Sequence, residues 1–167
     1  MAKVINVIGQ GSNVGKTMLL EGLIKELTSR GLSVATVKHD VHGFDIDHEG
    51  KDTYRHRESG ASTVVISSKK RFAMIKEVEE ELELIEILKL VKDKDIILVE
   101  GYKQSPLRKI EVYREGFSHK IITNEELLIA VATESTVNLE KTLIVKPNDY
   151  EKLADLVEQE KEFEFEK

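Results

Sequence analysis

The 167-residue sequence contains no cysteine, which excludes disulfide bonds and thiolate metal sites and is compatible with a cytosolic protein. It also lacks any apolar run close to the ~20 residues that a membrane-spanning helix requires. Its first residues do not follow the pattern of a secretion signal, in which a positively charged segment precedes an apolar one. We therefore expect a cytoplasmic protein that does not bind membranes.

An excess of positive charge is missing as well, because the formal net charge is −6 and the isoelectric point is about 5.5. This balance argues against sequence-independent binding to nucleic acid, so no nucleic-acid partner is expected. The length fits one nucleotide-binding domain over residues 1–167, with a core on both faces of an open sheet. The charged tail from about residue 158 to residue 167 is predicted to fray.

One stretch, residues 7–17 with the sequence VIGQGSNVGKT, organises the rest of the chain. An apolar segment leads into a glycine-rich turn, and a helical pattern with leucines on one face follows from about Lys16 to Arg30. In such a turn the backbone N–H groups converge on phosphate oxygens, and the helix start presents its unpaired amides to the same anion. We therefore predict a phosphate-binding P-loop. The residues expected to contact the nucleotide are Gly9, Gly11, Ser12, Asn13, Val14, Gly15, Lys16, Thr17 and Met18.

Two side chains of this loop have predicted chemical roles. Lys16 would reach the β- and γ-phosphates and act as a catalytic group, while the Thr17 hydroxyl would bind a Mg²⁺ ion held between those phosphates. Gln10 stands where the strict pattern G-x-x-x-x-G-K-[ST] has glycine. The turn is therefore predicted to be one residue longer, with Gly9 as its entry hinge, a spacing that resembles the loop of dethiobiotin synthetase.

An apolar strand that ends in a carboxylate is predicted at residues 95–100, which is the pattern of a Walker B strand. If this strand is parallel and adjacent to the first one, Glu100 lies close to Thr17 and can bind Mg²⁺ directly or through water. Glu100 is therefore the second predicted metal ligand and the second predicted catalytic residue. Lys103, which follows in the same segment, is a predicted nucleotide contact.

The remaining periodicity predicts an α/β fold of the P-loop NTPase type, with a mostly parallel open sheet flanked by helices and some antiparallel strand additions. The predicted strands cover residues 3–8, 32–37, 63–67, 72–76, 95–100, 128–132 and 143–145. The predicted helices cover residues 16–30, 52–59 and about 82–91, and a last helix opens at Asn148 with Glu151 completing a capping box. Ligands of such sheets bind beyond the carboxyl ends of the strands, so the segment after Val37 is expected beside the P-loop.

That segment, residues 38–61, contains four of the chain's five histidines together with many acidic and basic side chains. One interpretation is an anion site for a second phosphorylated group. Its candidate residues are Lys38, His39, Lys51, Arg55 and Arg57. The other interpretation is a site for a divalent metal, whose candidate ligands are His39, His42 and one of Asp40, Asp45 or Asp47. Asp40 is thus a third candidate metal ligand, a charged loop without a ligand is the remaining alternative, and the anion site is favoured.

The same segment resembles a long signature of the molybdopterin-guanine dinucleotide biosynthesis protein B (MobB) family. The matching residues are Lys38–His39, His42–Asp47 and Gly50–Ala61. Val99–Lys103 is similar to the family's Leu/Val-Glu-Gly-Phe/Tyr-Lys motif, and Lys109–Val112 with Arg114 is similar to its Lys-Ile-Glu-Val segment. The resemblance covers roughly residues 3–115, and Gln10 departs from the family's more usual loop.

The resemblance implies a protein that binds GTP and Mg²⁺ and assists the attachment of a guanine nucleotide to molybdopterin. It also implies a homodimer that works with the guanylyltransferase MobA and contacts a molybdopterin-type cofactor. Residues 39–57 are then expected to hold the phosphate end of that cofactor. Hydrolysis of GTP is expected to be weak and Mg²⁺-dependent, because the sequence has no evident water-positioning glutamine or arginine finger.

Two other functions fit the same residues. A P-loop kinase or ATP-dependent ligase of the dethiobiotin synthetase type would use residues 39–57 to hold its acceptor. A binding module would deliver a nucleotide or cofactor to a larger enzyme by contact alone. The sequence has no Asn-Lys-x-Asp motif for guanine, and a P-loop contacts only phosphates, so the choice between GTP and ATP stays open at this point.

Overall fold

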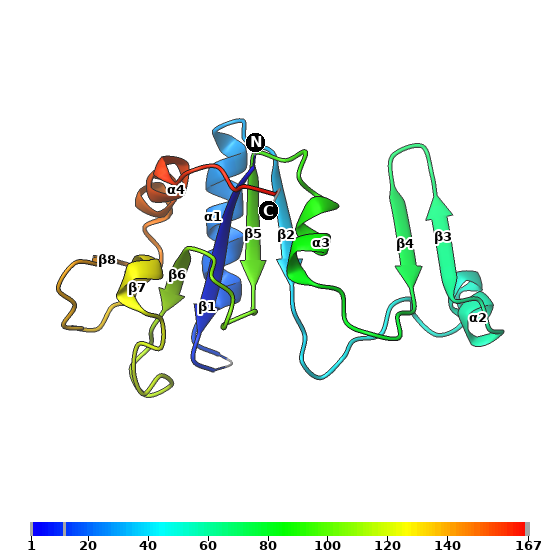
Figure 1. Cartoon of the computed structure of the whole chain (residues 1–167), viewed down its shortest axis with the longest axis horizontal. Coiled ribbons are helices and arrows are strands. Elements are labelled where there is room, and N and C mark those ends of the chain that lie inside the picture. Colours follow the sequence, from blue (N-terminus) through cyan, green and yellow to red (C-terminus); the bar gives the residue numbers. More distant parts are fainter. Residues whose placement is uncertain (1, 12, 166–167) are drawn as a thin grey trace. The chain divides into compact units, whose positions relative to one another are not determined.

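The computed structural model describes residues 2–11 and 13–165, and the chain forms two compact units (Figure 1). The first unit comprises Met1–His39 and Ile85–Lys167, and the second comprises Asp40–Leu84. None of the described helices is long and apolar enough to cross a membrane.

The first unit is built on a six-stranded sheet with the order β2-β5-β1-β6-β7-β8, in which every neighbouring pair is parallel. Its strands are β1 (Lys3–Gly9), β2 (Val34–Lys38), β5 (Ile96–Glu100), β6 (Lys109–Val112), β7 (Leu128–Ala132) and β8 (Leu143–Val145). The strand that leads into the predicted P-loop, β1, lies inside the sheet and is almost entirely buried, as its apolar sequence predicts. The structure confirms the predicted α/β fold with a parallel open sheet.

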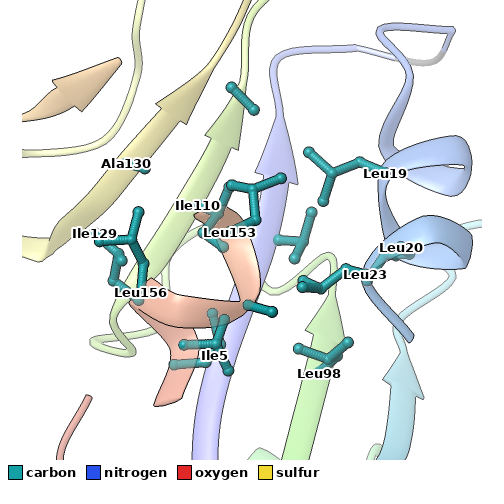
Figure 2. Close-up of a cluster of buried hydrophobic side chains, with 14 of the residues drawn as sticks. Ile5, Leu19, Leu20, Leu23, Leu98, Ile110, Ile129, Ala130, Leu153 and Leu156 are labelled. Carbon is teal, nitrogen blue, oxygen red and sulfur yellow. The ribbon is translucent and has the colours of Figure 1, made fainter. Parts of the chain in front are cut away.

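Two helices cover one face of this sheet. The helices α1 (Lys16–Ser29) and α4 (Tyr150–Gln159) pack against each other, and their leucines point toward the strands (Figure 2). Leu23 of α1 and Leu153 of α4 are fully buried, as the helical spacing of the leucines predicts. The chain leaves α1 at Gly31, where a φ of 85° gives the left-handed conformation that ends many helices.

Polar side chains are buried on the other face of the sheet. Asn6 is fully buried, and its amide donates hydrogen bonds to the carbonyl of Tyr102 (3.2 Å) and to Ser105 Oγ (3.1 Å). Its cross-strand partner Lys109 is also buried, and the Lys109 ammonium donates to the carbonyls of Ser105 and Leu107. Burial lowers the pKa of Lys109. These bonds fix the connection between β5 and β6 against the sheet.

The strand β6 is the element that the sequence pattern does not predict, because two of its residues are charged. All of its residues are nevertheless buried. The Glu111 carboxylate accepts hydrogen bonds from the backbone amides of Ile122 (2.8 Å) and Thr123 (2.9 Å). Two backbone donors compensate much of the cost of burying a charge, so a carboxylate is tolerated inside the sheet.

The second unit contains the helix α2 (Asp52–Glu58) and a separate antiparallel hairpin of β3 (Thr63–Ser67) and β4 (Phe72–Lys76). The helix and the hairpin lie where the sequence predicts them. Val64 is buried, but several large apolar side chains of this unit are at least half exposed. They are Val41, Phe44, Ile46, Val65, Ile66, Phe72, Met74 and Val78.

Two predicted helices have different boundaries in the structure. The helix expected at residues 82–91 is shorter, because α3 covers Leu84–Lys89. The last helix begins at Tyr150, and its cap is Asp149 rather than Asn148. The Asp149 carboxylate accepts a hydrogen bond from the backbone amide of Lys152 (3.2 Å), which satisfies a free amide of the first turn.

The described part of the charged tail makes contacts that its composition does not predict. The backbone amide of Phe163 donates a hydrogen bond to the carbonyl of Ala2 (2.9 Å). The Arg108 guanidinium forms two hydrogen bonds of 3.1 Å with the Glu160 carboxylate. The described part of the segment after α4 therefore contacts the rest of the first unit at these points, while residues 166 and 167 lie outside the described residues.

Candidate nucleotide-binding site

Two residues of the turn between β1 and α1 have a left-handed backbone conformation. Asn13 and Gly15 have φ angles of 64° and 105°, and residues in this left-handed region turn successive backbone amides toward one side of the chain. Gly9 lacks a side chain for another reason, since a Cβ there would lie 2.5 Å from Val14 Cγ2. The loop therefore folds closely over the end of β1, as the predicted P-loop requires.

Gln10 replaces the expected glycine and connects the loop to two other segments. Its side-chain oxygen accepts hydrogen bonds from the backbone amides of His119 (2.5 Å) and Lys120 (3.2 Å). Its backbone carbonyl accepts a hydrogen bond from the Lys103 ammonium (3.1 Å). The glutamine thus has a structural role, because Gln10 connects the loop by hydrogen bonds to the segments that contain Lys103 and His119.

Lys16 is the charged centre of the loop. Its ammonium donates a hydrogen bond to the carbonyl of Gly11 (2.6 Å). Burial lowers the pKa of Lys16, the negative charge of Glu100 raises it, and the positive charges of Lys103 and Lys38 lower it further. The structure therefore brings together four of the predicted site residues, and three of them are positively charged.

The sheet order explains why Glu100 and Lys38 come close to the loop. The strand β5 lies between β2 and β1, and Glu100 at its end is paired with Lys38 on one side and with Val7 on the other. The carboxyl ends of these three parallel strands meet at the edge from which the loop leaves. Thr17, the other predicted Mg²⁺ ligand, is exposed in the first turn of α1. The Walker B strand and the first strand are neighbours, as the sequence predicts.

The predicted contact His39 follows β2 and packs on the turn after β5. Its backbone amide donates a hydrogen bond to the carbonyl of Glu100 (2.9 Å), and its ring stacks on Tyr102 with 4.4 Å between the ring centroids. Gly101 allows this approach, because its φ is 88° and a Cβ there would lie 2.9 Å from the Cβ of His39. The Glu-Gly-Tyr sequence thus docks the turn after β5 on the end of β2.

Arg114 contacts the loop, although the sequence pattern does not assign it to the site. Its guanidinium donates a hydrogen bond to the carbonyl of Asn13 (3.3 Å) and lies 4.4 Å from the centre of the Phe117 ring. The position of Arg114 in the chain could have assigned it to the candidate site. Arg114 follows β6, a direct neighbour of β1, and therefore stands at the same edge of the sheet as the loop.

The other predicted anion-binding residues lie in the second unit. Lys51 directly precedes α2, and Arg55 is exposed in the last turn of that helix. The Arg57 guanidinium donates hydrogen bonds to the Asp45 carboxylate (2.5 Å) and to the carbonyl of Ile46 (3.1 Å). The hydrogen bond with Asp45 is the main cause that raises the pKa of Arg57. Arg57 therefore holds the loop that precedes α2, a role that the sequence does not predict.

The alternative of a histidine and aspartate metal site receives no support. Within residues 2–11 and 13–165, no three His, Asp or Glu side chains are grouped so that they could hold a metal ion. Asp40 accepts a hydrogen bond from the backbone amide of His42 (3.0 Å). A Mg²⁺ ion at the P-loop is a different case, because it takes many of its ligands from phosphates and water. Among the loop residues, Met18 is 71% exposed, and Ser12 lies outside the described residues.

The sequence is similar to one protein family over most of its length. The sequence model of MobB, molybdopterin guanine dinucleotide synthesis protein B, matches residues 4–134. The molybdopterin-guanine dinucleotide biosynthesis adapter protein of Escherichia coli (strain K12) is 39% identical, over 87% of this chain and 86% of that protein. The protein with the same description from Haemophilus influenzae is 36% identical, over 88% of this chain and 83% of that protein.

Solved structures are similar in fold. A crystal structure of molybdopterin-guanine biosynthesis protein B has a TM-score of 0.69 at 26% identity and covers 92% of this chain and 97% of that chain. The crystal structure of Bacillus subtilis MobB has a TM-score of 0.75 at 21% identity and covers 95% of this chain and 99% of that chain. The similarity in fold thus extends beyond residues 3–115, which carry the resemblance in sequence motifs.

Proposed function

Since this chain belongs to the MobB family, molybdopterin guanine dinucleotide synthesis protein B, we propose that it is a GTP-binding adapter in the synthesis of this dinucleotide. The two relatives from Escherichia coli and Haemophilus influenzae are adapter proteins of this synthesis by name. The proposal combines that role with the loop between β1 and α1, whose form suits a nucleoside triphosphate.

The concentration of positive charge at this loop is the main support for nucleotide binding. The positive charges of Lys38 and Lys103 lower the pKa of Lys16, and the negative charge of Glu100 raises it. Like charges that lie close together repel one another unless an anion compensates them. A triphosphate supplies this negative charge, and the amides of the loop and of the first turn of α1 supply hydrogen bonds to its oxygens.

Mg²⁺ is the proposed metal ion of this site. Thr17 offers a hydroxyl oxygen and Glu100 a carboxylate, and both are ligands of the kind that Mg²⁺ prefers. When bound, the ion would neutralise the charge that develops on the β- and γ-phosphates. Thr17 and Glu100 would hold the ion, directly or through water, while Lys16 contacts the phosphates.

The proposed hydrolysis of GTP is weak. Rapid hydrolysis depends on an arginine or a water-positioning side chain at the γ-phosphate. Arg114 lies at the loop, but its guanidinium is engaged by the carbonyl of Asn13 and by the ring of Phe117. Lys16 and Glu100 are then the groups that act on the nucleotide, and we expect slow turnover in the absence of a partner.

A second ligand and two protein partners complete the proposal. Lys51 and Arg55 of the second unit are proposed to bind the phosphate end of a molybdopterin-type cofactor, because basic side chains of this kind suit phosphate. Lys38 and His39 belong to the first unit and are proposed as phosphate contacts there. Arg57 would contribute through the loop that it holds. The guanylyltransferase MobA and a second copy of this chain are the proposed protein partners.

Competition between nucleotides tests the proposed ligand. The purified protein is titrated with a fluorescent GTP analogue in Mg²⁺, and unlabelled GTP and ATP are added as competitors. We expect GTP to displace the analogue at lower concentration than ATP. A strong preference for ATP would instead favour a kinase or ligase of the dethiobiotin synthetase type. The Thr17→Ala variant should weaken binding in Mg²⁺ and have little effect when the ion is chelated.

Turnover and mass measurements test the adapter role. GTP hydrolysis by the protein alone should be far slower than the roughly 1–100 s⁻¹ that is typical of kinases. The mass in solution, measured with and without the guanylyltransferase, should show a complex of the two proteins. A strict monomer whose mass does not change when the guanylyltransferase is added would contradict the adapter role.

A further inference from the structure

A cavity of about 310 Å³ adjoins the P-loop in the first unit. Its walls include Val14 and Gly15 of the loop and Met18 of α1, so the cavity begins where the phosphate cradle ends. Its volume lies at the lower end of the roughly 300–1,000 Å³ that is typical of small-molecule sites. A group that is attached to phosphates on the loop therefore has a direct path into the cavity.

The cavity also collects residues that follow three strands of the sheet. Tyr113 comes after β6, Glu134 after β7 and Asn148 after β8, and all three line the cavity. These strands follow one another on one side of β1, whereas β5 and β2, which end at Glu100 and Lys38, lie on the other side. The charged groups expected at the phosphates and the cavity thus occupy opposite sides of the loop.

The walls of the cavity combine aromatic surface with polar groups. Tyr150 lies so close to Gly22 of α1 that a Cβ on Gly22 would stand 2.1 Å from the Tyr150 Cζ. The absence of a side chain at Gly22 thus gives the Tyr150 ring its place in the wall. Glu134 and Asn148 are exposed polar residues that line the same cavity. A flat ligand with a hydrogen-bonding edge fits this combination.

We propose that this cavity binds the base of the nucleotide and that Glu134 makes the site specific for guanine, an inference that rests on the proposed binding of GTP. Guanine presents two adjacent donors, N1–H and the 2-amino group, and one carboxylate can accept hydrogen bonds from both. Adenine presents an acceptor at N1, which the carboxylate repels. A site that pairs with the edge of one base rejects another base that leaves its polar groups unpaired.

A pterin ring carries the same pair of hydrogen-bond donors as guanine. The test must therefore distinguish a pterin from the guanine base of a nucleotide as the ligand of this cavity. The P-loop favours the nucleotide, because phosphates held there place the attached base next to the cavity. We expect that neopterin, which has no phosphate, does not displace GTP. Displacement of GTP by neopterin at comparable concentration would assign the cavity to a pterin and overturn the proposal.

The main test compares GTP with inosine triphosphate, which lacks the 2-amino group, by titration calorimetry in Mg²⁺. The wild-type protein should bind GTP about tenfold more tightly or better, which is the effect of one charge-assisted hydrogen bond. The Glu134→Gln variant should bind GTP more weakly and lose most of this preference. The matched control is Glu140→Gln, because Glu140 is an exposed residue of the same connection between β7 and β8. This control should keep the wild-type preference.

The outcomes separate this inference from the proposed function. The Lys16→Ala variant should bind both GTP and inosine triphosphate much more weakly than the wild-type protein does. If the wild-type protein binds neither triphosphate, the proposed function is wrong and the inference falls with it. If binding depends on Lys16 but Glu134→Gln keeps the full preference for GTP, the assignment of Glu134 is wrong, while the P-loop function stands.

Discussion

Two groups of basic side chains, one in each unit of the chain, differ in what surrounds their charge. In the first unit, Lys38 and Lys103 lie close enough to Lys16, at the end of the sheet, for their positive charges to lower its pKa. In the second unit, Arg57 of α2 donates a hydrogen bond to Asp45 in the loop that precedes this helix. Positive charge that is concentrated in one place favours an anionic ligand, whereas the charge of Arg57 is paired with a carboxylate and connects α2 to the preceding loop.

The units also differ in the apolar surface that they bury. In the first unit, Leu23 and Leu153 are fully buried between the helices and the sheet (Figure 2). In the second unit, Phe72 is 66% exposed and Met74 is 54% exposed. An isolated two-stranded hairpin with little burial is only marginally stable. The first unit therefore contains the buried core that supports the candidate site, whereas the second unit leaves several of its large apolar side chains exposed.

The largest expected effect concerns this difference in burial. Leu153→Ala removes a fully buried side chain and should lower the free energy of unfolding by about 2–5 kcal/mol, because it leaves a cavity. Met74→Ala should change it by less than about 0.5 kcal/mol, since that side chain is already half exposed. Urea unfolding of both variants checks the comparison. Equal effects would show that the first unit does not contain the main core.

The second prediction removes charge from the loop. Lys16→Ala should weaken triphosphate binding by about tenfold or more, because it deletes a charge-assisted contact to the phosphates. Lys25→Ala is the matched control, since Lys25 is an exposed lysine of the same helix. It should bind the nucleotide normally. Calorimetric titration with GTP measures both variants, and circular dichroism verifies that both are folded.

The third prediction distinguishes the two arginines of α2. Arg55→Ala should weaken the binding of inorganic phosphate by roughly tenfold, measured by NMR on the amides of residues 50–57. Arg57→Ala should instead accelerate hydrogen exchange in the loop that contains Asp45, because that loop loses its hydrogen-bond donor. If Arg55→Ala leaves phosphate binding unchanged, the second unit does not use this residue for an anion.

The smallest expected effect is a dependence of affinity on pH. Burial lowers the pKa of Lys16 from the ordinary 10.5, and a bound triphosphate favours the charged form. The free protein therefore loses this charge at a lower pH than an ordinary lysine does. As the pH is raised, GTP affinity should begin to fall before pH 10.5 is reached. The titration of GTP between pH 8 and pH 10.5 measures this loss. In Lys16→Ala, the part of the pH dependence that comes from Lys16 should be absent.

The sequence predicts the sheet because its strands are apolar runs and because Lys16 follows a glycine-rich turn. It does not predict β6, since Lys109 and Glu111 are charged and only the folded chain shows the carbonyls and amides that pair with them. It also misplaces the cap of α4, because Asn148 and Asp149 are both good capping residues and the choice depends on the local backbone.

The candidate site is predictable where a motif carries it. Lys16, Glu100 and Lys103 are found from the P-loop and the Walker B pattern, and the structure brings them together. Glu134 and Arg114 belong to no such pattern, because their positions follow from the order of the strands. That order depends on packing between distant segments, which local sequence does not specify.

A structure of the protein with a non-hydrolysable GTP analogue and Mg²⁺ tests the central claim most directly. The account predicts that the triphosphate lies against the backbone of residues 9–17, with Lys16 at the β- and γ-phosphates and with Mg²⁺ near Thr17 and Glu100. A triphosphate bound beside Arg55 in the second unit, with no phosphate at the loop, would contradict it.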